Sequence, residues 1–302
     1  MAYSLKHKLV VGVSSRALFD LSKENEIFER EGMEAYCQYQ VSHENEILLP
    51  GPGFSLIRAL LRLNELPGNE GRVEVIIMSR SSTDASLRIF HSIRHYGLPI
   101  TRAVLSGGGS LAPYLEALEA DLFLSANEED VQRAIDFGIA AGMIINGKLH
   151  TYEEDGDFKQ IRIAFDGDAV LFTDESEKLF QKSGLAAFEE NERKQAWNPL
   201  QEGPFAKFLK TISEIQKEFP EQKVPIRTAL VTSRCAPAHE RVIRTLRAWN
   251  VRVDEAYFLG GISKKDVLKA FDAQIFFDDQ MIHALAASEV VPSARVPYKN
   301  SA

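Results

Sequence analysis

Two aspartates one residue apart, Asp166 and Asp168, are the first side chains whose type and spacing could support catalysis. They follow the apolar run IRIAF at residues 161–165, and Gly167 between them allows the backbone to turn sharply. In an open α/β sheet, ligands bind at the carboxyl ends of the strands, where these two carboxylates would lie. The alternative is a turn in which both aspartates bond only their own backbone, and this stretch alone does not distinguish the two hypotheses.

Three further groups of polar side chains occur at the predicted carboxyl ends of strands or at the helix starts beyond them. Thr232 ends one predicted strand, Lys264 and Lys265 begin a helix, and Asp278 and Asp279 follow another strand. Because the carboxyl ends of parallel strands share one edge of a sheet, these groups can converge on the first two aspartates. Several acidic oxygens there would suit Mg²⁺, a hard cation that prefers oxygen ligands.

Basic side chains accompany these groups. Arg234 follows Thr232 and Ser233, so its guanidinium could reach a bound anion, and pairing with acidic surface groups is the alternative. Arg241, Arg244 and Arg247 recur on the next predicted helix, where we expect them to be solvated.

The elements that must position these groups alternate between strand and helix along the whole chain. In the first half, buried strands are predicted at residues 9–13, 73–78, 100–105 and 120–124, with helical patterns between them. The second half continues in the same order. This alternation indicates an α/β fold with a parallel sheet and helical crossovers.

The second half also repeats landmarks of the first at spacings of 152 to 154 residues. The matched pairs are Gly32 with Gly184, Gly51-Pro52 with Gly203-Pro204, Ser79-Arg80 with Ser233-Arg234, Gly108 with Gly261, and Phe123 with Phe276. Sustained spacing of this kind favours an internal duplication. We therefore predict two halves, residues 1–155 and 156–302, joined within the polar stretch 146–160.

The first half lacks the charged groups of the second. Ser14 and Arg16 stand opposite Asp166 and Asp168, or Val13 and Ser15 if the register slips by one; Ser125 and Ala126 stand opposite Asp278 and Asp279, and Leu111 or a small neighbour opposite Lys264. The first half is therefore predicted to be a degenerate copy and the second to be the catalytic one.

The order of these motifs resembles that of the haloacid dehalogenase-like phosphatases, through FDGDAV, LVTSR, GGISKKD and FFDD. The whole chain resembles the cytosolic type I 5'-nucleotidases of that superfamily, through VSSRALFD, FDGDAVLFTDESE, an LxxGPF segment, VTSR and IFFDDQ. The resemblance implies a Rossmann-like fold and Mg²⁺-dependent removal of phosphate from nucleoside 5'-monophosphates.

The resemblance also implies roles for individual residues. Asp166 would attack phosphorus to form an aspartyl-phosphate, and Asp168 would protonate the departing 5'-oxygen. Thr232 and Lys264 would bind the phosphoryl group, with Lys265 as the rival for the lysine role.

For the metal, the resemblance implies that Mg²⁺ would be held by Asp166, the main-chain carbonyl of Asp168, and Asp278 or Asp279. Ser233 and Arg234 would complete the substrate-binding set.

Two stretches, residues 21–49 and 175–202, resemble small helical caps. In the second, four side chains could cover the active edge and offer a stacking surface to a base, or could simply pack the cap onto the core: Phe180, Leu185, Phe188 and Trp197. We expect the cap to govern substrate choice, because the catalytic groups contact only phosphate.

Composition limits the class of partner. The 302 residues carry 43 acidic and 35 basic side chains, a net charge of -8, which disfavours broad nucleic-acid or anionic-membrane binding. Two cysteines in no metal-ligand spacing, and no apolar run approaching the roughly 20 residues of a membrane span, predict a soluble cytoplasmic protein.

Other hypotheses stay open at this stage. The same chemistry would serve another phosphomonoester such as a sugar phosphate, and a non-catalytic nucleotide-binding regulator is the alternative from a different class. The first half could bind a regulatory nucleotide through Ser14, Ser15, Arg16 and Arg80. The sequence leaves homo-oligomer formation open.

Overall fold

The computed structural model describes residues 4–145 and 160–298, and the chain forms two compact units, residues 1–144 and 145–302. The predicted boundary between residues 155 and 156 lies outside the described residues. No helix among the described residues is both long enough and apolar enough to cross a bilayer.

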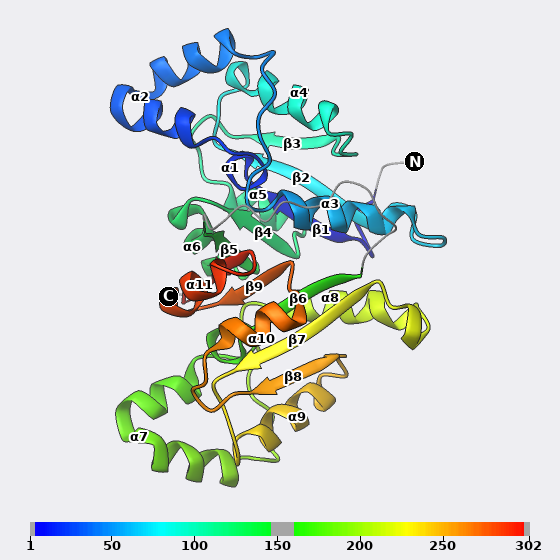
Figure 1. Ribbon diagram of the computed structural model, residues 1–302, viewed down its shortest axis with the longest axis vertical. Coiled ribbons are helices and arrows are strands. Elements are labelled where there is room, and N and C mark those ends of the chain that lie inside the picture. The colour runs from blue at the N-terminus through cyan, green and yellow to red at the C-terminus, as the bar shows by residue number, and fades with distance from the viewer. Residues whose placement is uncertain (1–3, 146–159, 299–302) are drawn as a thin grey trace. The chain divides into compact units, whose positions relative to one another are not determined.

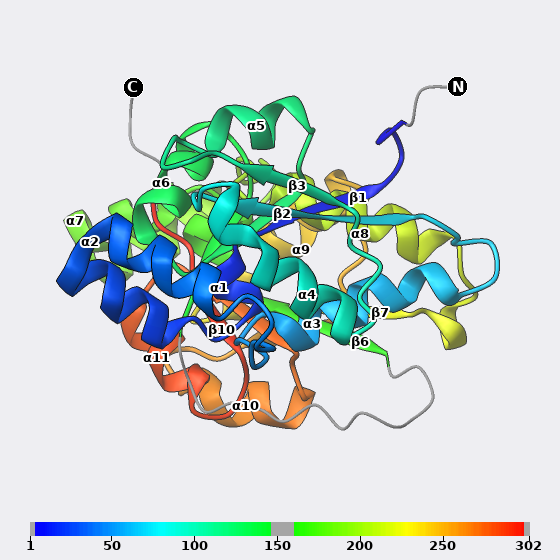
Figure 2. The same cartoon turned by 90° about the horizontal axis from the view of Figure 1, so that it is seen from above.

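The first unit contains five parallel strands in the order β3-β2-β1-β4-β5. The strands are β1 Leu9–Val13, β2 Val73–Ser79, β3 Arg102–Leu105, β4 Leu122–Ser125 and β5 Ala141–Ile144. The helices are α1 Ser15–Leu18, α2 Ser22–Ser42, α3 Phe54–Arg62, α4 Leu87–His95, α5 Ala112–Ala117 and α6 Glu128–Asp136, with single turns η1 Leu63–Glu65 and η2 Asp84–Ser86. Figure 2 shows α5 and α6 on one face of the strands and α3 and α4 on the other.

The second unit has five parallel strands in the order β8-β7-β6-β9-β10. The strands are β6 Ile161–Phe165, β7 Ile226–Thr232, β8 Glu255–Phe258, β9 Ile275–Asp278 and β10 Ser293–Arg295. The helices are α7 Glu175–Lys194, α8 Ala206–Lys217, α9 His239–Ala248, α10 Lys264–Phe271 and α11 Met281–Ser288, with short turns η3 Gly167–Leu171 and η4 Glu221–Lys223. Counted along the chain, the strand order equals that of the first unit. The predicted α/β class with a parallel sheet is confirmed.

The core of the second unit lies on both faces of its central strands, because successive side chains along a strand point to opposite faces. Ala164 and Phe276 face α10 and α11, in a cluster that includes Leu268 and Phe271. Phe165 and Phe277, the next residues along β6 and β9, stack with ring centroids 5.7 Å apart and contact Phe205 and Phe208 beside them. Because successive strand residues point to opposite faces, both faces of β6 and β9 are buried and their carboxyl ends are held rigidly.

A long bent helix follows the first strand of each unit (Figure 1). Gly32 interrupts α2 with φ 86° and ψ -175°, and Gly184 interrupts α7 with φ 77° and ψ 178°. Glycine adopts this positive φ without the steric cost that a Cβ imposes. The predicted cap segments 21–49 and 175–202 contain these two helices.

The glycine of each Gly-Pro landmark lies against the backbone where the chain returns from the bent helix. A Cβ on Gly203 would lie 2.4 Å from the Phe172 carbonyl oxygen, and one on Gly51 would lie 2.8 Å from the Phe19 carbonyl carbon. Only glycine allows this close approach, so the landmark has a packing cause.

Candidate active site

The central strand of the second unit delivers Asp166 to the carboxyl edge of the sheet. Phe165 of β6 is in register with Phe277 of β9, so the next residues, Asp166 and Asp278, are neighbours on adjacent strands. The Asp166 amide donates to the Phe277 carbonyl at 2.8 Å, which extends the ladder by one bond beyond the strand. The expected convergence of these aspartates at one edge therefore follows from strand register.

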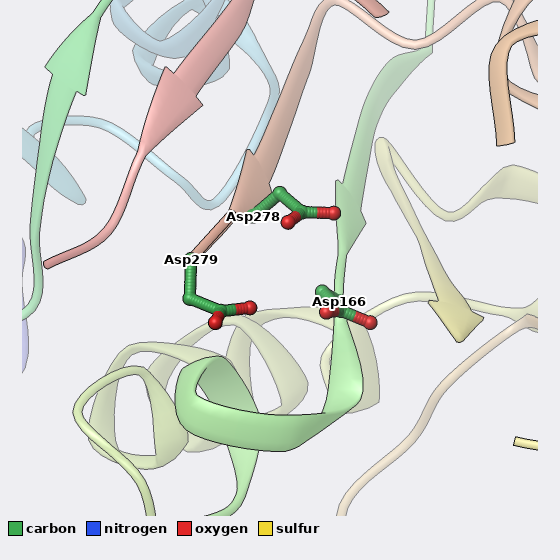
Figure 3. Close-up of side chains that lie close together, drawn as sticks. All are labelled: Asp166, Asp278 and Asp279. Carbon is green, nitrogen blue, oxygen red and sulfur yellow. The ribbon is translucent and has the colours of Figure 1, made fainter. Parts of the chain in front are cut away.

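Three carboxylates meet at this edge (Figure 3). One oxygen from each of Asp166, Asp278 and Asp279 lies within 4.8 Å of the others. Their side chains are buried, and the single ammonium of Lys264 lies 2.9 Å from Asp166 Oδ1 and 2.7 Å from Asp278 Oδ2. One positive charge thus faces three acidic groups.

Burial and neighbouring groups shift the pKa values of the three carboxyl groups in different directions. Burial raises the pKa of Asp166 well above its usual value, which Lys264 opposes. Burial likewise raises the pKa of Asp279 to about 6, although a hydrogen bond from Tyr298 opposes the shift. Burial would also raise the pKa of Asp278, but His283 and Lys264 hold it below its usual value.

Lys264 remains charged in this environment. Burial by itself would lower the pKa of Lys264, but the carboxylates of Asp166 and Asp278 outweigh that effect and raise it.

The donor set fits a hard divalent cation. Carboxylate oxygens are the ligands that Mg²⁺ prefers, and a doubly charged ion would balance the two negative charges that Lys264 leaves uncompensated when all three aspartates are ionised.

Asp168 lies in the turn after β6 and is held by Arg234. The Arg234 Nε donates to Asp168 Oδ2 at 2.8 Å and its Nη2 donates to Oδ1 at 2.7 Å, a bidentate geometry. The turn that presents Asp168 is irregular, because Ala169 adopts φ 60° within η3. Arg234 is therefore paired with an acidic side chain, as the second of the two predictions had it, but the pair is buried and not at the surface.

Glu192 of α7 holds the other side of the same guanidinium. Arg234 Nη1 donates to Glu192 Oε2 at 2.6 Å, while Glu192 Oε1 accepts from Arg241 at 2.9 Å and from Ser176 at 3.1 Å. Glu192 is 0% exposed. The expectation that Arg241 is solvated is wrong, because this buried carboxylate requires a counter-charge.

Thr232 ends β7 beside the turn. Its hydroxyl accepts from the Arg234 amide at 3.2 Å, and a Cβ on Gly167 would lie 3.3 Å from Thr232 Oγ1. Ser233 is exposed. The structure thus places Thr232 at the site, with the Ser233 side chain at the surface.

The two candidate lysines, Lys264 and Lys265, lie in different surroundings. Lys264 is the first residue of α10 and lies in the carboxylate cluster, whereas Lys265 is partly exposed and pairs with Glu289. The geometry favours Lys264 for the lysine role.

Two residues at the site carried no recognisable signal in the sequence. The Tyr298 hydroxyl donates to Asp279 Oδ2 at 2.6 Å from 19 residues further along the chain, after β10. Glu192 lies in a helix that contains several other acidic side chains. Neither the spacing nor the neighbours of these residues distinguish them.

The aromatic side chains of residues 175–202 divide into two sets. Phe188 lies beside the site, with the Arg234 guanidinium carbon 5.4 Å from its ring centroid, and it contacts Phe180 edge to face. Trp197 is 76% exposed and packs against Arg244 at 3.4 Å. Phe188 is thus the side chain of this set that lies nearest to the Asp168–Arg234 pair.

Comparisons with known proteins point to one family. A protein-family model described as 5'-nucleotidase matches residues 1–302. Human cytosolic 5'-nucleotidase 1B is 38% identical over 295 residues, which are 94% of this chain and 48% of the human protein. The chain therefore spans about half the length of this curated relative. No solved structure is significantly similar to it.

Proposed function

Because this chain belongs to the 5'-nucleotidase family, we propose that it hydrolyses nucleoside 5'-monophosphates to nucleoside and phosphate in a Mg²⁺-dependent reaction. The observation that carries the proposal is the buried cluster of Asp166, Asp278 and Asp279, in which Lys264 pairs with Asp166 and Asp278. The name of the human relative describes a cytosolic enzyme, and we propose the same compartment for this chain.

Asp166 is the nucleophile. Its free carboxylate oxygen attacks phosphorus, a phosphorus–oxygen bond forms to Asp166, and the bond to the 5'-oxygen breaks. Asp166 is suited to this role because Oδ1 is held by the Gly167 amide at 2.7 Å and by Lys264 at 2.9 Å, which orients the carboxylate.

Asp168 is the acid and base. It gives its proton to the departing 5'-oxygen, then takes a proton from the water that attacks phosphorus as the bond to Asp166 breaks. Arg234 contacts Asp168 and Glu192, so we assign it to positioning Asp168 rather than to direct substrate contact.

Phosphate binding is assigned to the groups around the cluster. Mg²⁺, held by Asp166, Asp278, Asp279 and the Asp168 carbonyl, would supply positive charge to the phosphoryl oxygens when bound. Lys264 and Thr232 bind the phosphoryl group from the sheet edge, and Ser233 presents its hydroxyl at the surface beside them.

We also propose that the two units descend from one duplicated ancestor, and three observations support this. Both have the same strand order. Gly107 and Gly108 have φ 56° and 93°, against 57° and 89° for Gly260 and Gly261. Register also agrees: Val13 pairs with Ile77 and Leu124 as Phe165 pairs with Leu230 and Phe277. By this register Ser79 corresponds to Thr232, one residue from the match predicted from sequence.

The bent helices α2 and α7 are proposed to be caps, and α7 to select the substrate. Phe188 is the aromatic side chain best placed to contact a base, since it lies beside Arg234. Exchange of residues 175–202 for the segment of a relative with another base preference tests this role. Unchanged preference would refute it.

A phosphate-release assay tests the function. Purified protein is incubated with Mg²⁺ and a panel of ribo- and deoxyribonucleoside 5'-monophosphates, with ribose 5-phosphate as a sugar phosphate. Asp166→Asn should lower turnover by at least about three orders of magnitude, whereas Asp174→Asn, which removes a surface partner of Lys178, should not. Preference for the sugar phosphate would redirect the proposal, and full turnover by Asp166→Asn would refute the mechanism.

A further inference from the structure

A cavity of about 190 Å³ lies in the first unit, at the carboxyl ends of its strands. Residues that follow β1, β2 and β4 line its base, among them Ser15, Arg16 and Ser81, and α2 lines its mouth with Phe28 and Tyr36. This edge is where open α/β sheets bind ligands. It is distinct from the carboxylate cluster, which lies wholly in the second unit.

Strand register shows what has replaced the catalytic groups there. By the pairing of Val13 and Phe165 with their neighbours, four positions correspond: Ser14 with Asp166, Arg16 with Asp168, Ser81 with Arg234, and Ser125 with Asp278. Asp166 and Asp278 correspond to hydroxyl side chains, Asp168 to a guanidinium, and Asp279 to the methyl group of Ala126. An anion could therefore enter this cavity without the metal ion that three carboxylates require.

Arg16 brings a positive charge to the lining of the cavity. Its side chain is half-buried and makes no hydrogen bond or ion pair with any residue in the part of the chain that the structure describes. Burial lowers the pKa of Arg16, an effect that the charge of Glu29 partly offsets. A guanidinium so placed gains from an anionic ligand.

The other charged groups of the cavity already have partners. Arg80 lies 3.5 Å from both Asp130 and Glu129, and Glu24 pairs with Arg88 at 2.5 Å. Arg80, which the sequence suggested alongside Arg16, is thus less available to a ligand.

The mouth of the cavity offers an aromatic surface. Phe28 and Tyr36 meet edge to face with ring centroids 6.1 Å apart, and Phe28 and Met33 are 43% and 45% exposed. Hydroxyl groups also line the cavity: those of the buried Ser15 and Ser79 are 3.3 Å apart, and those of the partly buried Tyr36 and Ser81 are 3.0 Å apart. Anion-binding groups at the base and apolar rings at the mouth suit a ligand with a phosphate at one end and a planar base at the other.

We propose that this cavity binds a nucleoside 5'-monophosphate without a metal ion, with the phosphate at Arg16 and the serine hydroxyls and the base against Phe28. The choice of a nucleoside monophosphate rests on the proposed function, whereas the anion site rests on the cavity itself. Binding here involves no bond-making step.

Metal dependence separates the two sites in one experiment. Binding of AMP to the full chain is measured by calorimetry in EDTA, where neither turnover nor metal-assisted binding at the carboxylates occurs. We expect one equivalent of AMP to bind. Arg16→Met should weaken binding by about 10- to 100-fold, Arg16→Lys should weaken it less, and Arg94→Met, an exposed arginine of the same unit, should leave it unchanged.

Further ligands and variants test whether AMP binds in this cavity. Phosphate and ribose 5-phosphate should bind more weakly than AMP, and Lys264→Met should leave AMP binding in EDTA intact. No binding in EDTA, binding that survives Arg16→Met, or binding that Lys264→Met abolishes would each overturn the proposal. Thermal unfolding of Arg16→Met and of Lys264→Met establishes that each variant is folded under the binding conditions. Arg16→Lys replaces Arg16→Met, and Thr232→Val replaces Lys264→Met, if either is not folded. Phosphate release with Mg²⁺ is measured separately, so a failure of the proposed activity leaves this result intact.

Discussion

Arg234 donates hydrogen bonds to both carboxylate oxygens of Asp168, at 2.8 and 2.7 Å, and its Nη1 donates to Glu192 of α7. A single guanidinium therefore links the proposed acid and base to the helix proposed as a cap. Asp168 accepts hydrogen bonds from Arg234 through both oxygens here. It can therefore carry a proton for the leaving group only when one of these hydrogen bonds is broken. We expect substrate binding against α7 to break it.

Arg234→Lys tests this link. Lysine keeps the charge but cannot bridge Asp168 and Glu192 with a planar fork. We expect kcat to fall about 10- to 100-fold with little change in KM, because Asp168 is mispositioned while phosphate binding is retained. Arg247→Lys, on an exposed position of α9, is the matched control. A pure rise in KM would instead indicate that Arg234 binds substrate.

Substitution of Lys264 and substitution of Lys265 are expected to affect activity and stability differently. Lys264→Met leaves Asp166 and Asp278 without their buried counter-charge, so phosphate release should fall by at least about 100-fold and stability by about 3 kcal/mol or more. Lys265→Met removes a partly exposed pair with Glu289 and should change stability by less than about 1 kcal/mol. Phosphate-release kinetics and urea unfolding measure both. Equal effects of the two substitutions would contradict the assignment.

The raised pKa of Asp279, about 6, predicts pH-dependent metal affinity. Below that pH the folded protein holds a proton on Asp279 that Mg²⁺ must displace, so affinity should fall by at least about tenfold per pH unit below pH 6. The raised pKa of Asp166 adds to this dependence in the same direction. Titration of Mg²⁺ by calorimetry from pH 5 to 8 measures this. Affinity independent of pH across that range would exclude Asp279 as a ligand.

Asp279 also predicts how the metal-free protein responds to pH. Its folded pKa lies above the ordinary value of 3.8, so its contribution to stability is fully present below about pH 4 and is lost as pH rises through about 6. In EDTA, melting temperatures should show this loss, and Asp279→Asn should remove it. Asp272→Asn, at an exposed position of the same unit, should keep the wild-type slope.

Gly203→Ala tests the packing cause of the Gly-Pro landmark. An added Cβ would lie 2.4 Å from the Phe172 carbonyl oxygen, a backbone atom that cannot move aside, so a loss of about 2–4 kcal/mol is expected. Gly109→Ala, whose nearest neighbour would lie at 3.2 Å, should cost much less. Urea unfolding compares them, and equal stability would show that the backbone relaxes freely.

The sequence by itself determined the class of fold and grouped the side chains of the proposed site. Apolar runs such as IRIAF bury both faces of a strand, and such strands alternate with helical patterns, so a parallel sheet was predictable. That topology brings strand ends to one edge, which is why Asp166, Lys264, Asp278 and Asp279 could be grouped before their contacts were seen.

Only the tertiary structure decided which groups pair. The structure pairs Arg234 with Asp168 and places Lys264, and not Lys265, in the carboxylate cluster. Both outcomes depend on helix rotation and loop conformation. These set the direction of each side chain, which residue spacing does not predict. The tertiary structure also decided the partners of Glu192 and Tyr298, and the absence of an ion-pair partner for Arg16 among the described residues. Each depends on burial and on partners distant in the chain, because the free energy of a buried charge is set by what surrounds it.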